Sequence, residues 1–171
     1  MNNRLLFCIE SNHQAETDYQ YIRETILYFY INDSKTSYRP LFMKTKTRYK
    51  SPATIKAINA FCNHSEKAKT HVIYFIDVDN CNASPEDKKL LNDIQEFCTS
   101  NDFELVLFCR DIEDVYWGKQ ISDSEKVKMA ESFKKQKKIS SVSESNLRKD
   151  GYSLHSSNIL TILDQYFLKN L

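Results

Sequence analysis

Residues 71–79 read HVIYFIDVD, and this stretch carries the strongest strand signal in the chain. Val, Ile, Tyr and Phe favour strands, and a short continuous apolar run is typical of a strand that is buried on both faces of a parallel sheet. The run ends in Asp77-Val78-Asp79. Because side chains two residues apart in an extended segment point the same way, we expect Asp77 and Asp79 to face one ion while Val78 turns to the core.

Apolar strand candidates alternate with amphipathic helices along the whole chain. Strands are predicted at residues 4–9, 41–43, 71–76 and 103–109, and helices at 15–31, from Ser51-Pro52, from Ser84-Pro85, at 111–117, 123–137 and 156–167. Strand and helix in alternation predict a parallel sheet with helices on its faces. We therefore expect an α/β fold, a Rossmann-like single domain with about four mainly parallel strands and helices on both faces.

The domain organisation follows from length and local composition. A chain of 171 residues predicts one domain. We expect an α/β core over residues 1–120 and a C-terminal helical extension, residues 121–171, packed on the same domain. The Ser-rich stretch at about 138–150 has little apolar content, so it is predicted to be a flexible loop.

Scarcity of glycine excludes several common functions. The chain has only two glycines, Gly118 and Gly151. They cannot build a G-x-G-x-x-G turn or a G-x-x-x-x-G-K-[ST] loop, and a G-x-S-x-G nucleophile elbow is absent for the same reason. Dinucleotide binding and P-loop nucleotide binding by these fingerprints are therefore excluded.

Charge is balanced overall but segregated along the chain, with a net charge of +1. Residues 35–50 hold six bases and no acid, residues 126–149 hold eight bases and two acids, and residues 76–115 hold eleven acids and three bases. Two basic segments around an acidic one predict a cation site within a polyanion-binding surface, or else solvated helix faces. Five scattered cysteines without a C-x-x-C, and no long apolar stretch, indicate a soluble cytoplasmic protein.

Carboxylates follow three of the predicted strands. Glu10 follows the first strand, Asp77 and Asp79 follow the third, and Glu113 follows the fourth. Ligands of open parallel sheets bind outside the carboxyl ends of the strands. Hard divalent cations such as Mg²⁺ take carboxylate oxygens, so these acids predict a cation site, with turn chemistry as the alternative for the D-x-D.

This order of motifs resembles the Toprim domain of primases, topoisomerases, small ribonucleases and OLD-type nucleases. In that domain an apolar strand ends in Glu, a helix follows, and a later apolar strand ends in D-x-D. The resemblance is nearest to the RloB-like and OLD-type branch, because residues 10–19 (ESNHQAETDY) add further acids before an aromatic-rich helix. Residues 112–117 (IEDVYW) also resemble a late Glu-x-x-Trp-like segment of that branch. The resemblance covers roughly residues 4–120.

The resemblance implies roles for individual residues. The catalytic and metal-binding candidates, for Mg²⁺ or Mn²⁺, are Glu10, Asp77, Asp79 and Glu113. Glu16 or Asp18 serves a second ion, or is only a first-turn acid of the following helix. His13 is a candidate for proton transfer near neutral pH. Ser11 stands where the family usually has Gly, in the tight turn after the glutamate.

Basic side chains are expected to neutralise the phosphate backbone of a nucleic acid. The candidates are Lys44, Lys46, Arg48, Lys50 and Arg110. The first four lie in the loop after the second predicted strand, at the same edge as the acids, and the alternative is that they form a solvated loop. Arg110 either contacts a phosphate or pairs with Asp111 or Asp114.

Together these features imply a metal-dependent nuclease of Toprim type that hydrolyses phosphodiester bonds in DNA or RNA. The resemblance also implies anti-phage defence with a separately encoded ATPase partner, because OLD-type Toprim domains are fused to an ATPase. The alternative is a non-catalytic Toprim-like subunit that binds nucleic acid or protein, which Ser11 favours and the four carboxylates disfavour. Other acid-cluster α/β enzymes fit less well, since haloacid-dehalogenase phosphatases and receiver domains place their acids after the first strand.

Overall fold

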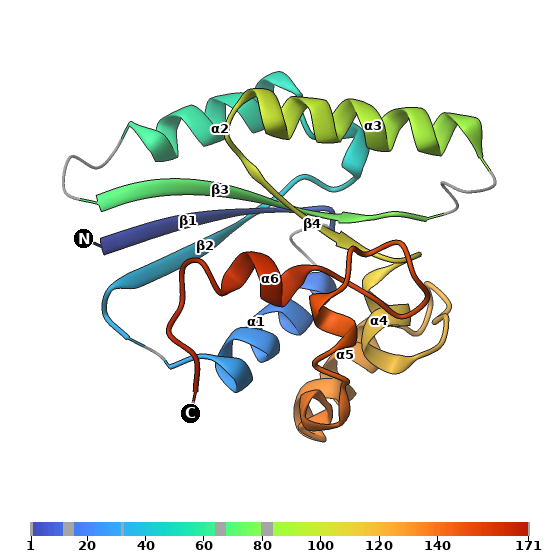
Figure 1. Ribbon diagram of the computed structural model, residues 1–171. Helices are drawn as coiled ribbons and strands as arrows, with labels where there is room; N and C mark the ends of the chain where they lie inside the picture. The colour runs from blue at the N-terminus through green and yellow to red at the C-terminus, as the bar shows by residue number, and fades with distance from the viewer. Residues whose placement is uncertain (1, 12–15, 32, 64–67, 80–83, 171) are drawn as a thin grey trace.

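The computed structural model describes residues 2–11, 16–31, 33–63, 68–79 and 84–170 (Figure 1). In chain order its elements are β1 (Asn2–Ile9), α1 (Thr17–Phe29), β2 (Thr36–Phe42), η1 (Lys46–Arg48), α2 (Pro52–Cys62), β3 (Ala68–Asp77), α3 (Pro85–Ser100), β4 (Glu104–Phe108), α4 (Ile112–Trp117), α5 (Lys126–Lys135), η2 (Lys138–Ser141), η3 (Asn146–Arg148) and α6 (Ile159–Leu163). Strands and helices thus alternate as the sequence predicts.

Four parallel strands form one sheet in the order β2-β1-β3-β4. The two central strands, β1 and β3, pair from Asn2↔Ala68 to Ile9↔Phe75. Helices cover both faces of the sheet (Figure 1). The predicted α/β class is therefore confirmed, and the architecture is consistent with a Rossmann-like or Toprim-type single domain.

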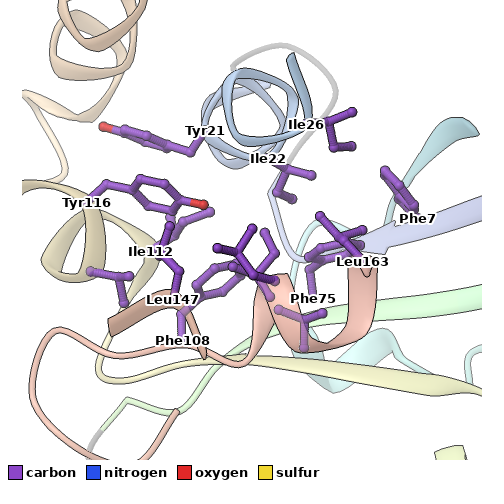
Figure 2. Packing of buried hydrophobic residues seen from close by; sticks show 14 of the residues in the cluster. Phe7, Tyr21, Ile22, Ile26, Phe75, Phe108, Ile112, Tyr116, Leu147 and Leu163 are labelled. Atoms are coloured by element: carbon purple, nitrogen blue, oxygen red, sulfur yellow. The ribbon is translucent and has the colours of Figure 1, made fainter. Parts of the chain in front are cut away.

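Alternate strand residues supply two separate cores. Phe7, Phe75 and Phe108 belong to the core beneath α1, α4, α5 and α6, part of which Figure 2 shows. Their neighbours Cys8 and Tyr74 belong to the second core, beneath α2 and α3. Because both faces of the central strands are covered, their buried parts, residues 5–9 of β1 and 72–76 of β3, are continuous apolar runs and do not alternate.

The helices α2 and α3 begin at the Ser-Pro pairs where the sequence predicts them. Ser51 caps α2, accepting a hydrogen bond from the Thr54 backbone N–H (3.3 Å), and proline occupies the first turn. Ser84 caps α3 in the same way, accepting from the Asp87 backbone N–H (3.2 Å). A short polar side chain before proline pre-organises the first turn, so these starts are set locally.

The second strand is earlier and longer than predicted. It spans Thr36–Phe42 and not only residues 41–43. It is an edge strand that pairs with β1 alone, and it contains Pro40. An edge strand tolerates proline. The part of β2 that was not predicted, residues 36–40, is mostly polar and includes this proline, so it has no apolar pattern to identify it.

The last helix is shorter than predicted, Ile159–Leu163 in place of residues 156–167. Residues before it lie along the free edge of β4, where the Leu107 backbone N–H donates to Asn158 Oδ1 (2.8 Å) and Asn158 Nδ2 donates to the Leu105 carbonyl (2.9 Å). Asn158 therefore covers the sheet edge, and this contact competes with helix formation in the residues before it.

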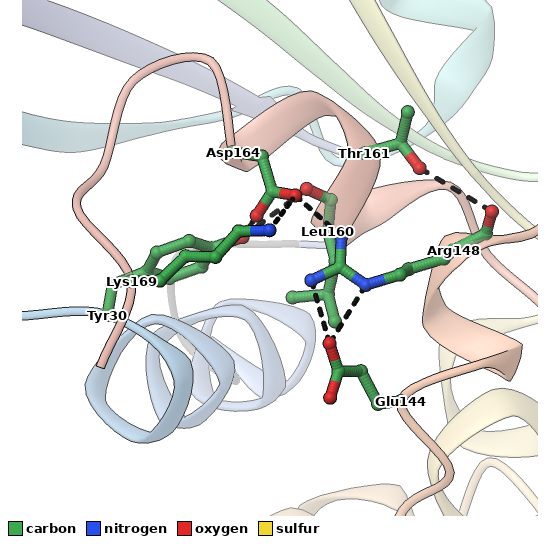
Figure 3. A network of polar contacts seen from close by, with 7 residues as sticks. All are labelled: Tyr30, Glu144, Arg148, Leu160, Thr161, Asp164 and Lys169. Atoms are coloured by element: carbon green, nitrogen blue, oxygen red, sulfur yellow. Dashed lines mark hydrogen bonds and ion pairs between the residues drawn. The ribbon is translucent and has the colours of Figure 1, made fainter. Parts of the chain in front are cut away.

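Residues 138–150 differ from the predicted flexible loop. The segment forms η2 and η3, and Ile139 (4% exposed) and Leu147 (0%) fill the core beneath α1. Arg148 lies in a polar network in which its Nη1 donates to Asp164 Oδ2 (2.6 Å) (Figure 3). Two buried apolar side chains and one arginine thus attach this Ser-rich segment to the rest of the domain.

Candidate functional site

The strand order creates a crevice between β1 and β3. From β1 the chain passes to β2 on one side, whereas β3 lies on the other side, so the order of strands reverses at this point. Open parallel sheets bind ligands at such a point, outside the carboxyl ends of the strands. Glu10 follows β1, Asp77 ends β3, and the Asp77 backbone N–H donates a hydrogen bond to Glu10 Oε2 (3.3 Å). The structure thus brings these two acids together.

A pocket of about 420 Å³ opens at this crevice. Its lining comes from β3, α1, α5 and the segments after β1, after β2 and before α5. It consists of Glu10, Ser11, Thr17, Asp18, Lys44, Asp77, Asp123, Lys126 and Val127. Asp18 lies in the first turn of α1, where Thr17 Oγ1 donates to Asp18 Oδ1 (3.1 Å). Lys126 is the first residue of α5. The C-terminal extension therefore completes the pocket.

Glu113, on α4, does not line the pocket itself but contacts Lys126, which does. Its side chain is 0% exposed, and Lys126 Nζ lies 3.3 Å from its Oε2. Its Oε1 has no hydrogen-bond partner among the residues that the structure describes. A buried carboxylate with an unsatisfied oxygen is costly unless a cation or a proton compensates it.

Burial, together with repulsion between neighbouring carboxylates, raises the pKa values of the acids at this site. Burial raises the pKa of Asp77 well above its usual range, and the charges of Glu10 and Asp18 raise it further. Burial also raises the pKa of Asp18 to about 6 and that of Glu113 to about 7. The pKa of Lys126, which burial lowers, is raised overall because Glu113 lies beside it. Carboxylates held together in this way attract a cation.

Asp79 does not line the pocket. Its half-exposed side chain pairs with Lys46, whose Nζ also donates to the Asp77 carbonyl (3.0 Å). Val78 is buried, as the sequence predicts. The expectation that Asp77 and Asp79 face one ion is not met, because β3 ends at Asp77 and the backbone at Asp79 turns to a positive φ of 50°.

The predicted phosphate-binding residues occupy different environments. Lys44 is exposed and lines the pocket. Lys46 is 9% exposed and forms the ion pair just described, so it is not part of a solvated loop. Arg48 and Lys50 are exposed and lie outside the pocket lining. Arg110 forms an ion pair with Asp114 on α4, with its Nη1 4.0 Å from Asp114 Oδ1.

Several residues near the carboxyl ends of the strands have a strained, left-handed backbone conformation. Five non-glycine residues here have positive φ: Glu16 (48°), Lys44 (75°), Asp79 (50°), Arg110 (63°) and His155 (57°). Such conformations are costly and cluster at functional sites. Ser11 is not among the described residues with positive φ, so the glycine that the Toprim resemblance leads one to expect is not required for the turn after β1.

The residues fit a hard divalent cation that keeps part of its water shell. Within the described ranges, no group of three or more His, Cys, Asp and Glu side chains is arranged to hold a metal ion. Mg²⁺, however, is usually bound through one or two carboxylates, waters and substrate phosphates. The adjacent Glu10 and Asp77, which both line the pocket, provide such a pair.

Sequence reasoning missed Lys126 and gave Asp18 only as an alternative to Glu16. In the structure Asp18 lines the pocket, whereas Glu16 lies outside the lining, just before α1. Lys126 is one of eight bases in residues 126–149, and nothing local distinguishes it from the others. Its role depends on how α5 packs on α1. His13 lies outside the described residues.

Comparison with protein-family models, with curated proteins and with solved structures finds no match to this chain. In the described part of the chain, no helix has both the length and the apolar character needed to cross a membrane. The fold and the pocket by themselves define an α/β protein with a carboxylate-lined pocket at the carboxyl ends of β1 and β3.

Proposed function

We propose that this protein is a metal-dependent nuclease of Toprim type that hydrolyses phosphodiester bonds in DNA or RNA. The observation that carries the proposal is the pocket in which Glu10, Asp18 and Asp77 meet at the β1/β3 crevice. Burial raises the pKa values of all three, and neighbouring acids raise them further, so a bound Mg²⁺ or Mn²⁺ would offset the charge that they carry when ionised. The resemblance to Toprim domains supports the same chemistry.

In this proposal each group has one task. Glu10 and Asp77 hold the cation, which when bound polarises a phosphoryl oxygen and lowers the pKa of a bound water. Asp18 and Glu113 hold or release a proton near neutral pH, because their pKa values lie at about 6 and about 7. Lys44, exposed at the pocket, contacts the substrate phosphate.

Two charged residues have positioning tasks. Lys126 orients Glu113 through their ion pair, and Lys46 anchors the loop after β2 to the end of β3. An ATPase partner and a role in defence against phage also belong to the proposal, and they rest on the resemblance alone.

The test is cleavage of labelled single- and double-stranded DNA and RNA by the purified protein with Mg²⁺ or Mn²⁺. We expect cleavage of at least one substrate, and a loss of at least about 100-fold in Glu10→Gln and in Asp77→Asn, in line with the loss of a group that acts in the transition state. Asp93→Asn is the matched control, because Asp93 lies on α3, outside the pocket lining, in an ion pair with Lys89.

Two results would contradict the proposal: no cleavage of any of the four substrates, or equal cleavage by wild type and both pocket variants. Binding of nucleic acid without cleavage would instead support the alternative, a non-catalytic binding subunit. The observation that favours that alternative is the pair of internal ion pairs, Lys46–Asp79 and Lys126–Glu113, which neutralise two acids without an external cation.

A further inference from the structure

Lys126 is a basic side chain inside the carboxylate pocket. Of the described residues that line the pocket, Lys44 and Lys126 are the basic ones. Lys44 is exposed, whereas the Lys126 side chain is only 27% exposed. The Lys126 Nζ lies 3.3 Å from Glu113 Oε2 and 3.7 Å from Asp123 Oδ1. Its ammonium is therefore held between an acid of α4 and an acid of the segment before α5.

The charge of Lys126 also acts on acids further into the site. Burial raises the pKa of Asp18 and that of Asp111, and the charge of Lys126 opposes both rises. Burial lowers the pKa of the ammonium itself, but the charges of Glu113, Asp111 and Asp77 raise it overall. One fixed positive charge thus interacts with acids from β3, from α1 and from the start of α4.

The position of Lys126 at the start of α5 depends on tertiary packing. The N-terminus of a helix carries a partial positive charge, so a lysine there is unfavourable unless acids lie close by. Lys126 is nevertheless the first residue of α5. Phe133 anchors this helix, because its ring packs on Tyr21 of α1 (centroids 4.9 Å apart) and on Tyr116 of α4 (5.4 Å). The packing of α5 therefore brings the ammonium to the pocket acids.

Lys46 is the other buried lysine at this edge of the sheet, and its contacts lie outside the pocket lining. Its ammonium pairs with Asp79 and donates to the Asp77 carbonyl (3.0 Å). Asp79 is thus neutralised from within the protein. The adjacent carboxylates of Glu10 and Asp77 remain to hold an ion in the pocket.

We infer that the pocket binds one divalent ion, at Glu10 and Asp77, and that the Lys126 ammonium takes the place of a second ion. The inference rests on the proposed function and states how many ions it needs. In two-ion sites the second ion stabilises charge on the reacting phosphate. A preorganised ammonium supplies charge of the same sign without binding a metal. Asp18, which the Toprim resemblance assigns to a second ion, then interacts with Lys126 in its place.

The test counts the ions bound to the purified protein. Titration with Mn²⁺, followed by the electron paramagnetic resonance signal of the free ion and by calorimetry, gives the number bound per chain. We expect one Mn²⁺ for wild type and two for Lys126→Met and Lys126→Gln, because these variants leave the acids around the ammonium without their cation. Lys126→Arg keeps the charge and should bind one. Lys128→Met is the matched control, since Lys128 is exposed on the same helix outside the pocket lining, and it should also bind one.

The outcomes separate this inference from the nuclease proposal. Two Mn²⁺ per wild-type chain overturn the inference, whatever the variants do, and leave the nuclease standing. One Mn²⁺ on Lys126→Met and Lys126→Gln, with folding confirmed by circular dichroism, overturns it as well. A second Mn²⁺ on Lys128→Met shows an effect of net charge, and it also overturns the inference. Absence of cleavage together with the expected counts overturns the nuclease and keeps the one-ion pocket. Wild-type protein that binds no Mn²⁺ overturns both.

Discussion

Glu113→Gln is expected to stabilise the metal-free protein at alkaline pH. Glu113 is 0% exposed and pairs with Lys126, and among the described residues its Oε1 has no hydrogen-bond partner. Burial and the charge of Asp18 raise its pKa from 4.5 to about 7. A group whose folded-state pKa is raised binds its proton more tightly in the native state, so stability falls as pH rises between these two values.

The magnitude follows from the two pKa values. Each pH unit between 4.5 and about 7 changes the free energy of unfolding by about 1.4 kcal/mol. Ionisation of Glu113 therefore costs the native state roughly 3 kcal/mol once pH exceeds about 7. Glutamine has the shape of the protonated acid and no charge to lose. The variant should thus resemble wild type near pH 5 and exceed it in stability by about 2–3 kcal/mol near pH 8.

Urea unfolding of wild type and variant at both pH values, with a chelator present, measures this difference. Glu86→Gln is the matched control, since Glu86 is an exposed acid in the first turn of α3, and its effect should change with pH by less than about 0.5 kcal/mol. A Glu113→Gln variant that is less stable than wild type near pH 8, or whose effect is the same at both pH values, would refute the assignment of Glu113 as a buried acid with a raised pKa.

Three further predictions concern the same pocket and its support. Mg²⁺ at about 100 times its Kd should stabilise the protein by about 2.7 kcal/mol, or roughly 5–10 °C in Tm, and Asp77→Asn should abolish the shift seen by scanning calorimetry. Asp18→Asn should lower the cleavage rate at least about tenfold, whereas Glu16→Gln should leave it within about twofold, because only Asp18 lines the pocket. Phe133→Ala should cost about 3–5 kcal/mol in chemical denaturation, since Phe133 is 1% exposed in the core beneath α1.

Prediction of the fold from the sequence succeeded where the signal is local. The apolar run of β3 and the Ser-Pro starts of α2 and α3 depend on residues within one or two turns. Prediction was poorer for β2 and α6, whose limits depend on distant contacts. Asn158 illustrates this, because its amide bonds to the edge of β4, about 50 residues earlier in the chain.

The candidate site shows the same division. The adjacency of Glu10 and Asp77 could be predicted because parallel strands end at a common edge. The direction of Asp79 could not be predicted, because it depends on where β3 ends and on Lys46 from the loop after β2. Lys126 could not be predicted either, since it reaches the pocket only through the packing of α5.

The sequence by itself determined the α/β class, the strand that carries Asp77 and the presence of acids at strand ends, because apolar runs and caps act over a few residues. The tertiary structure alone decided which charges meet. Lys46 lies after β2, and Lys126 and His155 lie in the C-terminal extension. Each pairs with an acid from another part of the fold. Coulomb interactions depend on distance in space and not on separation along the chain. These ion pairs therefore cannot be predicted before the packing of the helices on the sheet is known.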